Sequence, residues 1–191
     1  MQVQRIVNDA LGTNTYLVSD LGFVFVIDPG SNGDEIIWRL NSLSRPVDAI
    51  LITHGHFDHI FSSYLVQQEF DCDFFLSEKD VGGLKRTEFF SFISGFGRFK
   101  LPECVKPLET ARSTFENLNI HAYPGHTPGS HAIEINGCLF SGDIYLKNLP
   151  ADTKIPFSNS IEEKVSAEKF KIDTVGRKIF PGHGKPYIMG A

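Results

Sequence analysis

A short apolar segment that runs directly into a cluster of histidines and aspartate is the feature that most constrains this chain. Residues 47–52 (VDAILI) have the length and apolar character of a buried strand. They are followed by the sequence His54-x-His56-x-Asp58-His59. Imidazole nitrogens and carboxylate oxygens are the ligands that zinc and similar divalent ions prefer. We therefore expect a strand whose end carries a metal-binding loop.

The spacing within this loop indicates two sets of ligands. His54 and His56 can point the same way, because residues i and i+2 share one side of an extended chain. Asp58 and His59 lie where the chain turns into a helix, so they can face a second ion on the other side of the loop.

Three further ligand candidates share one context. His126, Asp143 and His183 each follow an apolar strand-like run, in a turn rich in glycine or proline. Glycine lets the backbone approach a ligand closely, and loops at strand ends are where scaffolds assemble sites from distant parts of a sequence. We therefore group these residues with the first loop as metal ligands.

Other polar residues are weaker candidates for a role at the metal site. Asp28, in an Asp-Pro-Gly turn, is either a plain turn residue or a carboxylate that holds a ligand imidazole through its other nitrogen. His121 and His131 lie in strand-like segments and are expected to be strand residues.

Composition excludes several classes of protein. With a net charge of -5 and a pI of about 5.8, the chain has no global basic field to attract nucleic acid. We find no signal-peptide pattern at the start and no apolar run of the length that spans a membrane. The cysteines form no CxxC pair and are expected to be free thiols in a reducing, cytoplasmic compartment; they are Cys72, Cys104 and Cys138.

The rest of the chain mixes short strands, helices and hairpins. Asn136-Gly137 between two apolar runs predicts a hairpin, and a turn at 20–22 predicts another. Asp34 is the expected cap of a helix over 35–43. The other expected elements are strands at 14–18, 23–27, 73–77, 119–123, 131–135, 138–140 and 177–180, and helices at 59–69, 85–93 and 161–173. This mixture predicts an α/β or α+β class with more than one sheet, and the length predicts one domain over 1–191.

These motifs, taken in order, resemble the metallo-β-lactamase-fold superfamily. THGHFDH, GHTPGSH, SGD and PGHG follow that family's order, and the resemblance runs from residue 28 to residue 184. It implies an α/β fold, a four-layer αββα sandwich of two mixed β-sheets flanked by helices, with the metal site at one edge. It also implies a ligand assignment: His54, His56 and His126 on one ion, Asp58, His59 and His183 on a second, and Asp143 bridging both.

Within this superfamily, the chain looks most like small, single-domain glyoxalase II-like thioesterases. The resemblance implies a dinuclear-metal hydrolase of a thioester or related small acyl ester, similar to hydroxyacylglutathione hydrolase. Its cofactors would be two divalent ions, zinc first, with iron or manganese as alternatives. Such ions lower the pKa of a water that attacks the carbonyl, with Asp58 and Asp143 as the catalytic carboxylates. Tyr145 and Lys147 are candidates for contacting the substrate.

The chain departs from that branch in two places. It ends soon after PGHG, without the helical domain that helps bind glutathione in full-length glyoxalase II. The sequence IYLKNLPADTKIPFSN after Asp143 lacks the Gly-Arg pattern common there. Both departures weaken the expectation of a glutathione thioester as the substrate.

Several alternatives stay open. One is hydrolysis of a lactone or a phosphodiester. Another is a mononuclear-iron dioxygenase acting on persulfides, which would use His54, His126 and Asp143. A non-catalytic binder is disfavoured, because buried His and Asp clusters are costly without a metal. The partner would be a small-molecule substrate, with the protein a monomer or a homodimer. The Phe-rich segment 89–99 is expected to pack in the core, with a pocket wall or a dimer contact as the alternatives.

Overall fold

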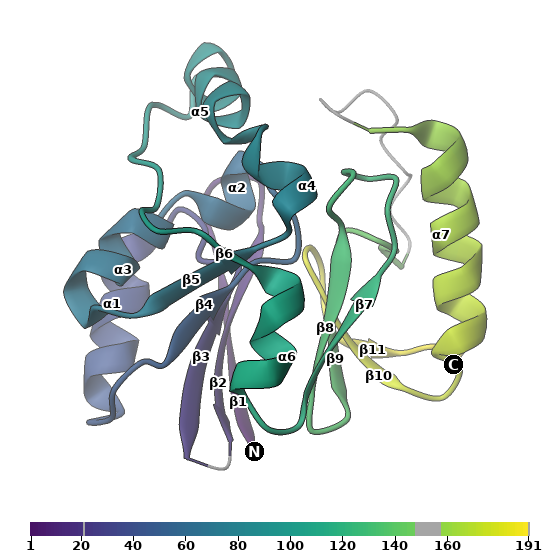
Figure 1. The fold of residues 1–191 in the computed structure, drawn as a ribbon, viewed down its shortest axis with the longest axis horizontal. Helices are drawn as coiled ribbons and strands as arrows, with labels where there is room; N and C mark the ends of the chain where they lie inside the picture. The colour runs from purple at the N-terminus through teal and green to yellow at the C-terminus, as the bar shows by residue number, and fades with distance from the viewer. Residues whose placement is uncertain (21, 148–157, 191) are drawn as a thin grey trace.

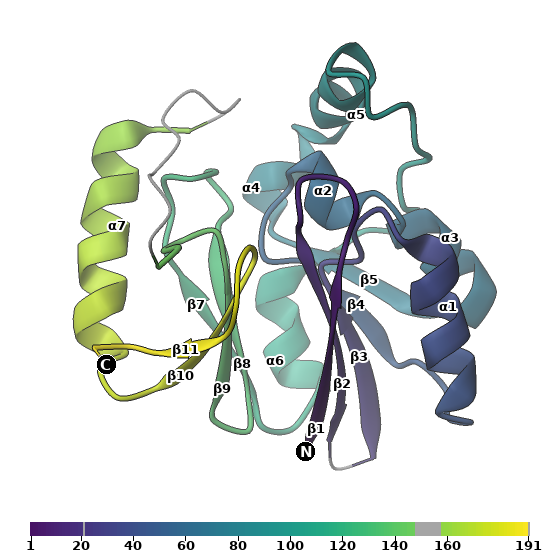
Figure 2. The same ribbon diagram turned by 180° about the vertical axis from the view of Figure 1, so that it is seen from behind.

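Two β-sheets lie face to face at the centre of the molecule. The computed structural model describes residues 1–20, 22–147 and 158–190. One sheet has six strands in the order β1-β2-β3-β4-β5-β6, and the other has five in the order β11-β10-β9-β8-β7. Helices α1 and α3 cover the outer face of the first sheet, and α7 covers the outer face of the second (Figures 1 and 2). This arrangement confirms the predicted αββα sandwich.

The first sheet combines an antiparallel half with a parallel half. Strands β1 to β3 pair antiparallel, and β3 to β6 pair parallel. The strands are β1 Gln2–Val7, β2 Asn14–Asp20, β3 Phe23–Ile27, β4 Ala49–Leu51, β5 Asp73–Leu76 and β6 Lys106–Pro107. The helices among and after them are α1 Gly33–Ser42, α2 Phe57–Ile60, α3 Ser63–Phe70, α4 Glu78–Val81, α5 Leu84–Ile93, η1 Leu108–Thr110 and α6 Ala111–Thr114.

The second sheet is mostly antiparallel. Among the strands that the structure describes, β9 and β10 pair parallel, and the other three pairings of this sheet are antiparallel. Its elements are β7 Leu118–Ala122, β8 His131–Ile135, β9 Cys138–Gly142, α7 Ser160–Asp173, β10 Lys178–Pro181 and β11 Tyr187–Ile188.

Alternation along the strands builds two of the three cores. In β3, Val24 and Val26 join the cluster under α1 and α3, whereas Phe25 and Ile27 join the cluster between the sheets. Successive side chains of a strand point to opposite faces, so one apolar strand serves both layers. A third cluster lies between the second sheet and α7, where Phe170 is fully buried.

Both predicted hairpins form. Strands β2 and β3 pair antiparallel, although Leu21 of their predicted turn lies outside the described residues. Asn136 and Gly137 have φ of 45° and 81°, as a two-residue turn between β8 and β9 requires. The three cysteines are unpaired. Within the described ranges, no helix is long and apolar enough to cross a bilayer.

Three predictions of local structure were wrong. The helix expected over 59–69 is divided into α2 and α3, because the Ser62 amide donates to the Pro29 carbonyl (3.0 Å) instead of continuing the first helix. Asp34 does not cap α1: Asn32 occupies the cap position, and Asp34 lies in the first turn. The Phe-rich segment lies mostly outside the core: Phe89 and Phe92 are 54% and 49% exposed, although Phe99 packs, partly buried, against the cluster under α1 and α3.

Candidate metal centre

The candidate site lies where strands of both sheets end. The loop after β4 carries His54 and His56, and the short helix α2 carries Asp58 and His59. The second sheet supplies one residue from each of three loops: His126 after β7, Asp143 after β9 and His183 after β10. All seven predicted ligands are thus brought to one edge of the sandwich.

Their side chains form three overlapping groups. In each group, the possible ligand atoms lie within 4.8 Å of one another, and the groups are His54/His56/His126, His54/His59/Asp143 and Asp58/His59/His183. The first and third groups are the two triads that the resemblance implied.

Asp143 stands between the two triads. Its Oδ2 lies 3.6 Å from Nε2 of His126 and 3.3 Å from Nε2 of His183, and its Oδ1 lies 3.6 Å from Nε2 of His59. One carboxylate therefore contacts the donor atoms of both groups, which is the position required of a bridging ligand.

The donor atoms fit divalent cations. Among the described residues, His59 Nε2, His126 Nε2 and Asp143 Oδ1 are buried without a hydrogen-bond partner. Leaving such atoms unpaired is costly, and imidazole nitrogen and carboxylate oxygen are suitable ligands for zinc-like ions. The residues present can hold two such ions.

Burial and mutual charge shift the titration of the cluster. Burial alone would lower the pKa of His183, yet Asp143 raises it to about 10. Burial likewise opposes protonation of His59, yet Asp58 and Asp143 raise its pKa well above the usual value. Burial would raise the pKa of Asp58, yet the His59 charge lowers it to about 2. Burial and the neighbouring His59 hold the pKa of His54 well below its usual range. Without metal, the cluster is an ion-pair network in which protons occupy atoms that a cation would need.

Two of the predicted ligands, His59 and Asp58, form hydrogen bonds with residues outside the ligand groups. Asp28 Oδ2 lies 2.9 Å from Nδ1 of His59, and the Thr53 amide and hydroxyl donate to the two Asp28 oxygens at 2.8 and 2.7 Å. The Thr13 hydroxyl donates to Asp58 Oδ2 at 2.6 Å. Asp28 thus has the geometry of the orienting role that the sequence suggested, and that role stays a prediction.

The sequence interpretation missed Glu163. This residue of α7 is 7% exposed, and its Oε1 lies 3.3 Å from Nδ1 of His126. The N-terminal part of α7 is fastened to the same loop, because the Asn159 amide donates to the Gly125 carbonyl (2.7 Å) and the Ser166 hydroxyl to the Pro124 carbonyl (2.6 Å). A glutamate in the first turn of a helix usually indicates only a favourable helix terminus, so no sequence signal marked it.

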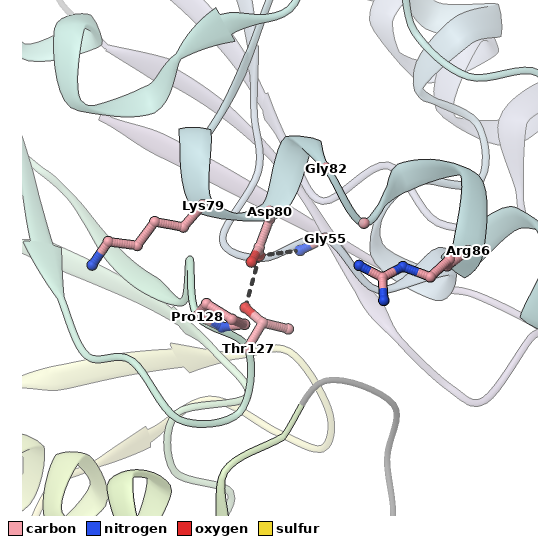
Figure 3. A pocket seen from close by; sticks show the side chains of 8 residues that line it. Gly55, Lys79, Asp80, Gly82, Arg86, Thr127 and Pro128 are labelled. Atoms are coloured by element: carbon pink, nitrogen blue, oxygen red, sulfur yellow. Dashed lines mark hydrogen bonds between the residues drawn. The ribbon is translucent and has the colours of Figure 1, made fainter.

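The sequence interpretation also missed Asp80. Its buried carboxylate accepts hydrogen bonds from the Gly55 amide (2.8 Å), the Thr127 hydroxyl (2.7 Å) and the Gly129 amide (2.8 Å). Figure 3 shows Asp80 between Gly55 and Thr127. This one side chain ties the His54–His56 loop of the first sheet to the His126 loop of the second.

The remaining candidates lie away from the ligand groups. His121 and His131 are residues of β7 and β8, as predicted. The Tyr145 ring packs near Tyr187 in the cluster under α7, and the Lys147 ammonium lies 5.7 Å from the centre of the Tyr187 ring. Contact of Tyr145 and Lys147 with a substrate stays a prediction. Much of the segment that departs from the glyoxalase II pattern, 148–157, lies outside the described residues.

Comparisons with known proteins point to one superfamily. The sequence model of the metallo-beta-lactamase superfamily matches residues 8–183. A probable metallo-hydrolase of Streptococcus pyogenes is 31% identical, over 96% of this chain and 84% of that protein. The hydroxyacylglutathione hydrolase GloC of Haemophilus influenzae is 28% identical, over 86% of this chain and 82% of that protein. The crystal structure of TTHA1623 in a di-iron-bound form has a TM-score of 0.89 at 24% identity, covering 98% of this chain and 96% of the other.

Proposed function

Because the chain belongs to the metallo-beta-lactamase superfamily, we propose that it is a two-metal hydrolase of a thioester or related small acyl ester. The family match confirms the resemblance drawn from the motifs and supports a metal-dependent hydrolase. The choice of a thioester is supported by the relative named as a hydroxyacylglutathione hydrolase. We propose zinc as the metal, with iron and manganese as alternatives, and a single domain over residues 1–191.

The observation that carries the proposal is the position of Asp143 between two complete triads. A mononuclear site built from His54, His126 and Asp143 would leave Asp58, His59 and His183 without a task, although their possible ligand atoms lie within 4.8 Å of one another. Among the described residues, His59 Nε2 is buried without a hydrogen-bond partner, which is costly, so the second triad favours a second ion. For the same reason, we propose a persulfide dioxygenase only as the second candidate.

Each residue then has a defined task. Two divalent ions would supply Lewis acidity, which makes a water more acidic and stabilises charge on the substrate oxygen. His54, His56 and His126 would hold one ion, and Asp58, His59 and His183 the other, with Asp143 shared. Asp58, fixed by the Thr13 hydroxyl, would also orient the attacking water. Asp28 would keep the His59 ring turned so that Nε2 faces the site.

A substrate panel on the purified, metal-loaded protein tests the proposal. The panel contains S-lactoylglutathione, a simple thioester, a homoserine lactone and bis(p-nitrophenyl) phosphate, with oxygen uptake measured on glutathione persulfide. We expect thioester hydrolysis to be fastest and metal analysis to give about two ions per chain. Fastest turnover of the lactone or phosphodiester would replace the thioester assignment, and oxygen uptake with one iron per chain would replace hydrolysis.

Variants test the residues. His56→Ala and Asp143→Ala should each abolish hydrolysis while the far-UV circular dichroism stays unchanged. His121→Ala is the matched control, because this histidine lies on β7 and binds Glu134 (2.8 Å). Full activity in Asp143→Ala would refute the shared-carboxylate site.

A further inference from the structure

One buried carboxylate, that of Asp80, bonds to the two loops that carry the first proposed triad. Its Oδ2 accepts hydrogen bonds from the Gly55 amide (2.8 Å) and the Thr127 hydroxyl (2.7 Å), as Figure 3 shows. Its Oδ1 accepts a third hydrogen bond from the Gly129 amide (2.8 Å). Gly55 belongs to the loop after β4, whereas Thr127 and Gly129 belong to the loop after β7. Asp80 therefore joins the two sheets at the site.

These hydrogen bonds lie next to the proposed ligands in the chain. Gly55 stands between His54 and His56, and Thr127 directly follows His126. The centre of the His126 ring lies 4.7 Å from that of His54 and 4.6 Å from that of His56, although His126 comes from the other sheet. A change in the distance between the two loops would therefore change the distances among the three rings.

The two loops close tightly on the Asp80 side chain. A Cβ atom placed on Gly55 would lie 3.1 Å from the Cβ of Asp80, and one placed on Gly129 would lie 2.6 Å from its Cγ. Contacts this close leave no space for a longer side chain at position 80. The size of the aspartate thus matches the gap between the two loop backbones.

Helix α4 holds Asp80 independently of these loops. The Asp80 amide donates to the Ser77 carbonyl (3.0 Å), and its carbonyl accepts from the Gly83 amide (2.8 Å). The Ser77 hydroxyl in turn donates to Glu109 of η1 (2.7 Å). The helix also follows β5 directly, so the carboxylate has a fixed origin at the edge of the first sheet.

The second proposed triad is joined across the sheets by a different residue. The Thr13 hydroxyl donates to Asp58 Oδ2 (2.6 Å), and the Thr13 backbone forms an isolated antiparallel bridge with His183. Each triad thus has its own residue that contacts chain segments from both sheets.

We propose that Asp80 is the positioning residue of the first metal site and that it controls the affinity of this site separately from that of the second. The inference rests on the proposed function, because it concerns one of the two proposed ion sites. An ion requires its ligand atoms at set distances, so a change in loop spacing lowers affinity. In Asp80→Asn one oxygen becomes an amide group. Since Gly55 and Gly129 both donate from the backbone, this amide would face a donor whichever way it turns.

Zinc affinity in two single-site backgrounds tests the inference. His183→Ala keeps the first triad, His56→Ala keeps the second, and competition with a chromogenic chelator gives the affinity in each. Added to His183→Ala, Asp80→Asn should lower affinity about tenfold. Added to His56→Ala, it should change affinity by no more than about twofold. Thr13→Val should show the reverse pattern, because it removes a hydrogen bond to a ligand of the second triad.

Glu78→Gln is the matched control for Asp80→Asn. It removes one carboxylate from an exposed residue of the same helix, and it should alter neither affinity. The backbone bond from the His131 amide to the Thr53 carbonyl (2.9 Å) also joins the two loops, so we expect Asp80→Asn to fold, which circular dichroism checks. Equal losses of affinity in both backgrounds would show a general effect on the fold and refute the inference. Unchanged affinity in the His183→Ala background would refute it as well.

Two further measurements separate this inference from the proposed function. In the metal-free protein, hydrogen exchange at the Gly55 and Gly129 amides should be faster in Asp80→Asn than in the wild type. Faster exchange with unchanged zinc affinity would show that the bonds hold the loops without affecting the site, and only the inference would fail. If Asp80→Asn loses zinc affinity selectively but the wild-type protein cleaves no thioester, the positioning role stands and thioester hydrolysis is wrong. If the wild-type protein binds no ion, both fail.

Discussion

At the scale of single residues, two of the candidate ligands, His59 and His126, each contact a carboxylate outside the ligand groups. Asp28 holds His59, Glu163 holds His126, and each carboxylate contacts the ring nitrogen that faces away from the ligand group. Such contacts fix the ring orientation and tautomer and make the imidazole a better ligand. The energetics of the proposed centre therefore depend on residues that would never touch a metal.

Substitution of Glu163 should weaken binding of the first ion. In Glu163→Gln the volume is kept but the carboxylate charge is lost, so we expect metal affinity to fall about tenfold. Competition with a chromogenic chelator measures the affinity independently of turnover. Glu162→Gln, in the same helical turn, is the control. Equal affinity in both variants would show that Glu163 serves only the packing of α7.

Metal loading at pH 7 should release protons. The pKa of His183 in the metal-free protein is about 10, so this side chain carries a proton at neutral pH that it must lose to become a ligand. Because the pKa is raised above its unfolded value of about 6.5, the charge stabilises the metal-free fold below that value, and this contribution is lost as pH rises toward 10. Metal affinity should therefore strengthen as pH rises from 6 to 8.

Calorimetry in two buffers of different ionisation enthalpy measures this release. The heat of metal binding should differ between the buffers, by less for His183→Ala than for the wild-type protein. Identical heats in both buffers for the wild-type protein would contradict the prediction.

At the scale of elements, the sequence predicts the strands and turns that have a regular residue pattern, and it does not predict very short strands or breaks caused by distant residues. The apolar runs of β3, β5 and β8 and the Asn-Gly turn were recognised because each pattern reports its own local structure. Strands β6 and β11 have two residues each, too few for any periodicity. The break between α2 and α3 depends on the Pro29 carbonyl, which is distant in sequence.

In the candidate site, too, only the residues that belong to a local pattern could be predicted from the sequence. The histidines and aspartates of the 54–59 loop and the three later ligands lie next to glycine or proline, at the ends of apolar runs. Asp28 could be predicted because it lies in an Asp-Pro-Gly turn. Glu163, Asp80 and Thr13 are common residues whose position becomes informative only when the two sheets meet.

The contact between α7 and the His126 loop should be sensitive to Gly125. This glycine has φ of 134°, and a Cβ atom there would collide with the backbone of Glu163. Gly125→Ala should destabilise the fold by about 1–3 kcal/mol and reduce metal affinity, because α7 must move away from His126. Gly137→Ala is the control, since its φ is 81° but its added Cβ meets nothing within 4 Å. Denaturant unfolding gives the free energies, and equal metal affinity in both variants would contradict the proposed coupling.

At the scale of the whole molecule, the candidate site lies at one end of a largely apolar interface between two sheets. Tyr16 of β2 packs against Phe140 and Phe180 of the second sheet, and its hydroxyl donates to the Pro181 carbonyl at 2.7 Å. The ligand groups add polar contacts at one end of this interface, with donors from both sheets in each proposed triad. Bound ions would therefore cross-link the sandwich.

Removal of metal should lower the thermal stability of the protein. A ligand at 100 times its dissociation constant stabilises the folded state by about 2.7 kcal/mol per site, so chelation should lower Tm by several degrees. Differential scanning fluorimetry with and without chelator measures the change. Asp143→Ala, which lacks the shared carboxylate, should show a much smaller change. An equal change in both proteins would place the stabilising ions elsewhere.

Thr13 and His183 form an isolated antiparallel bridge, and the Asn14 amide donates to the Gly182 carbonyl at 2.6 Å. In each contact, the residue near the N-terminus (Thr13 or Asn14) is synthesised about 170 residues before its partner. A nascent chain can therefore complete β2 to β5 and expose the His54–His59 loop while the strand that delivers His183 is still untranslated. Capture of a full pair of ions would follow synthesis of β10, so the cofactor would lock a chain whose first sheet is already made and would not guide the folding of that sheet.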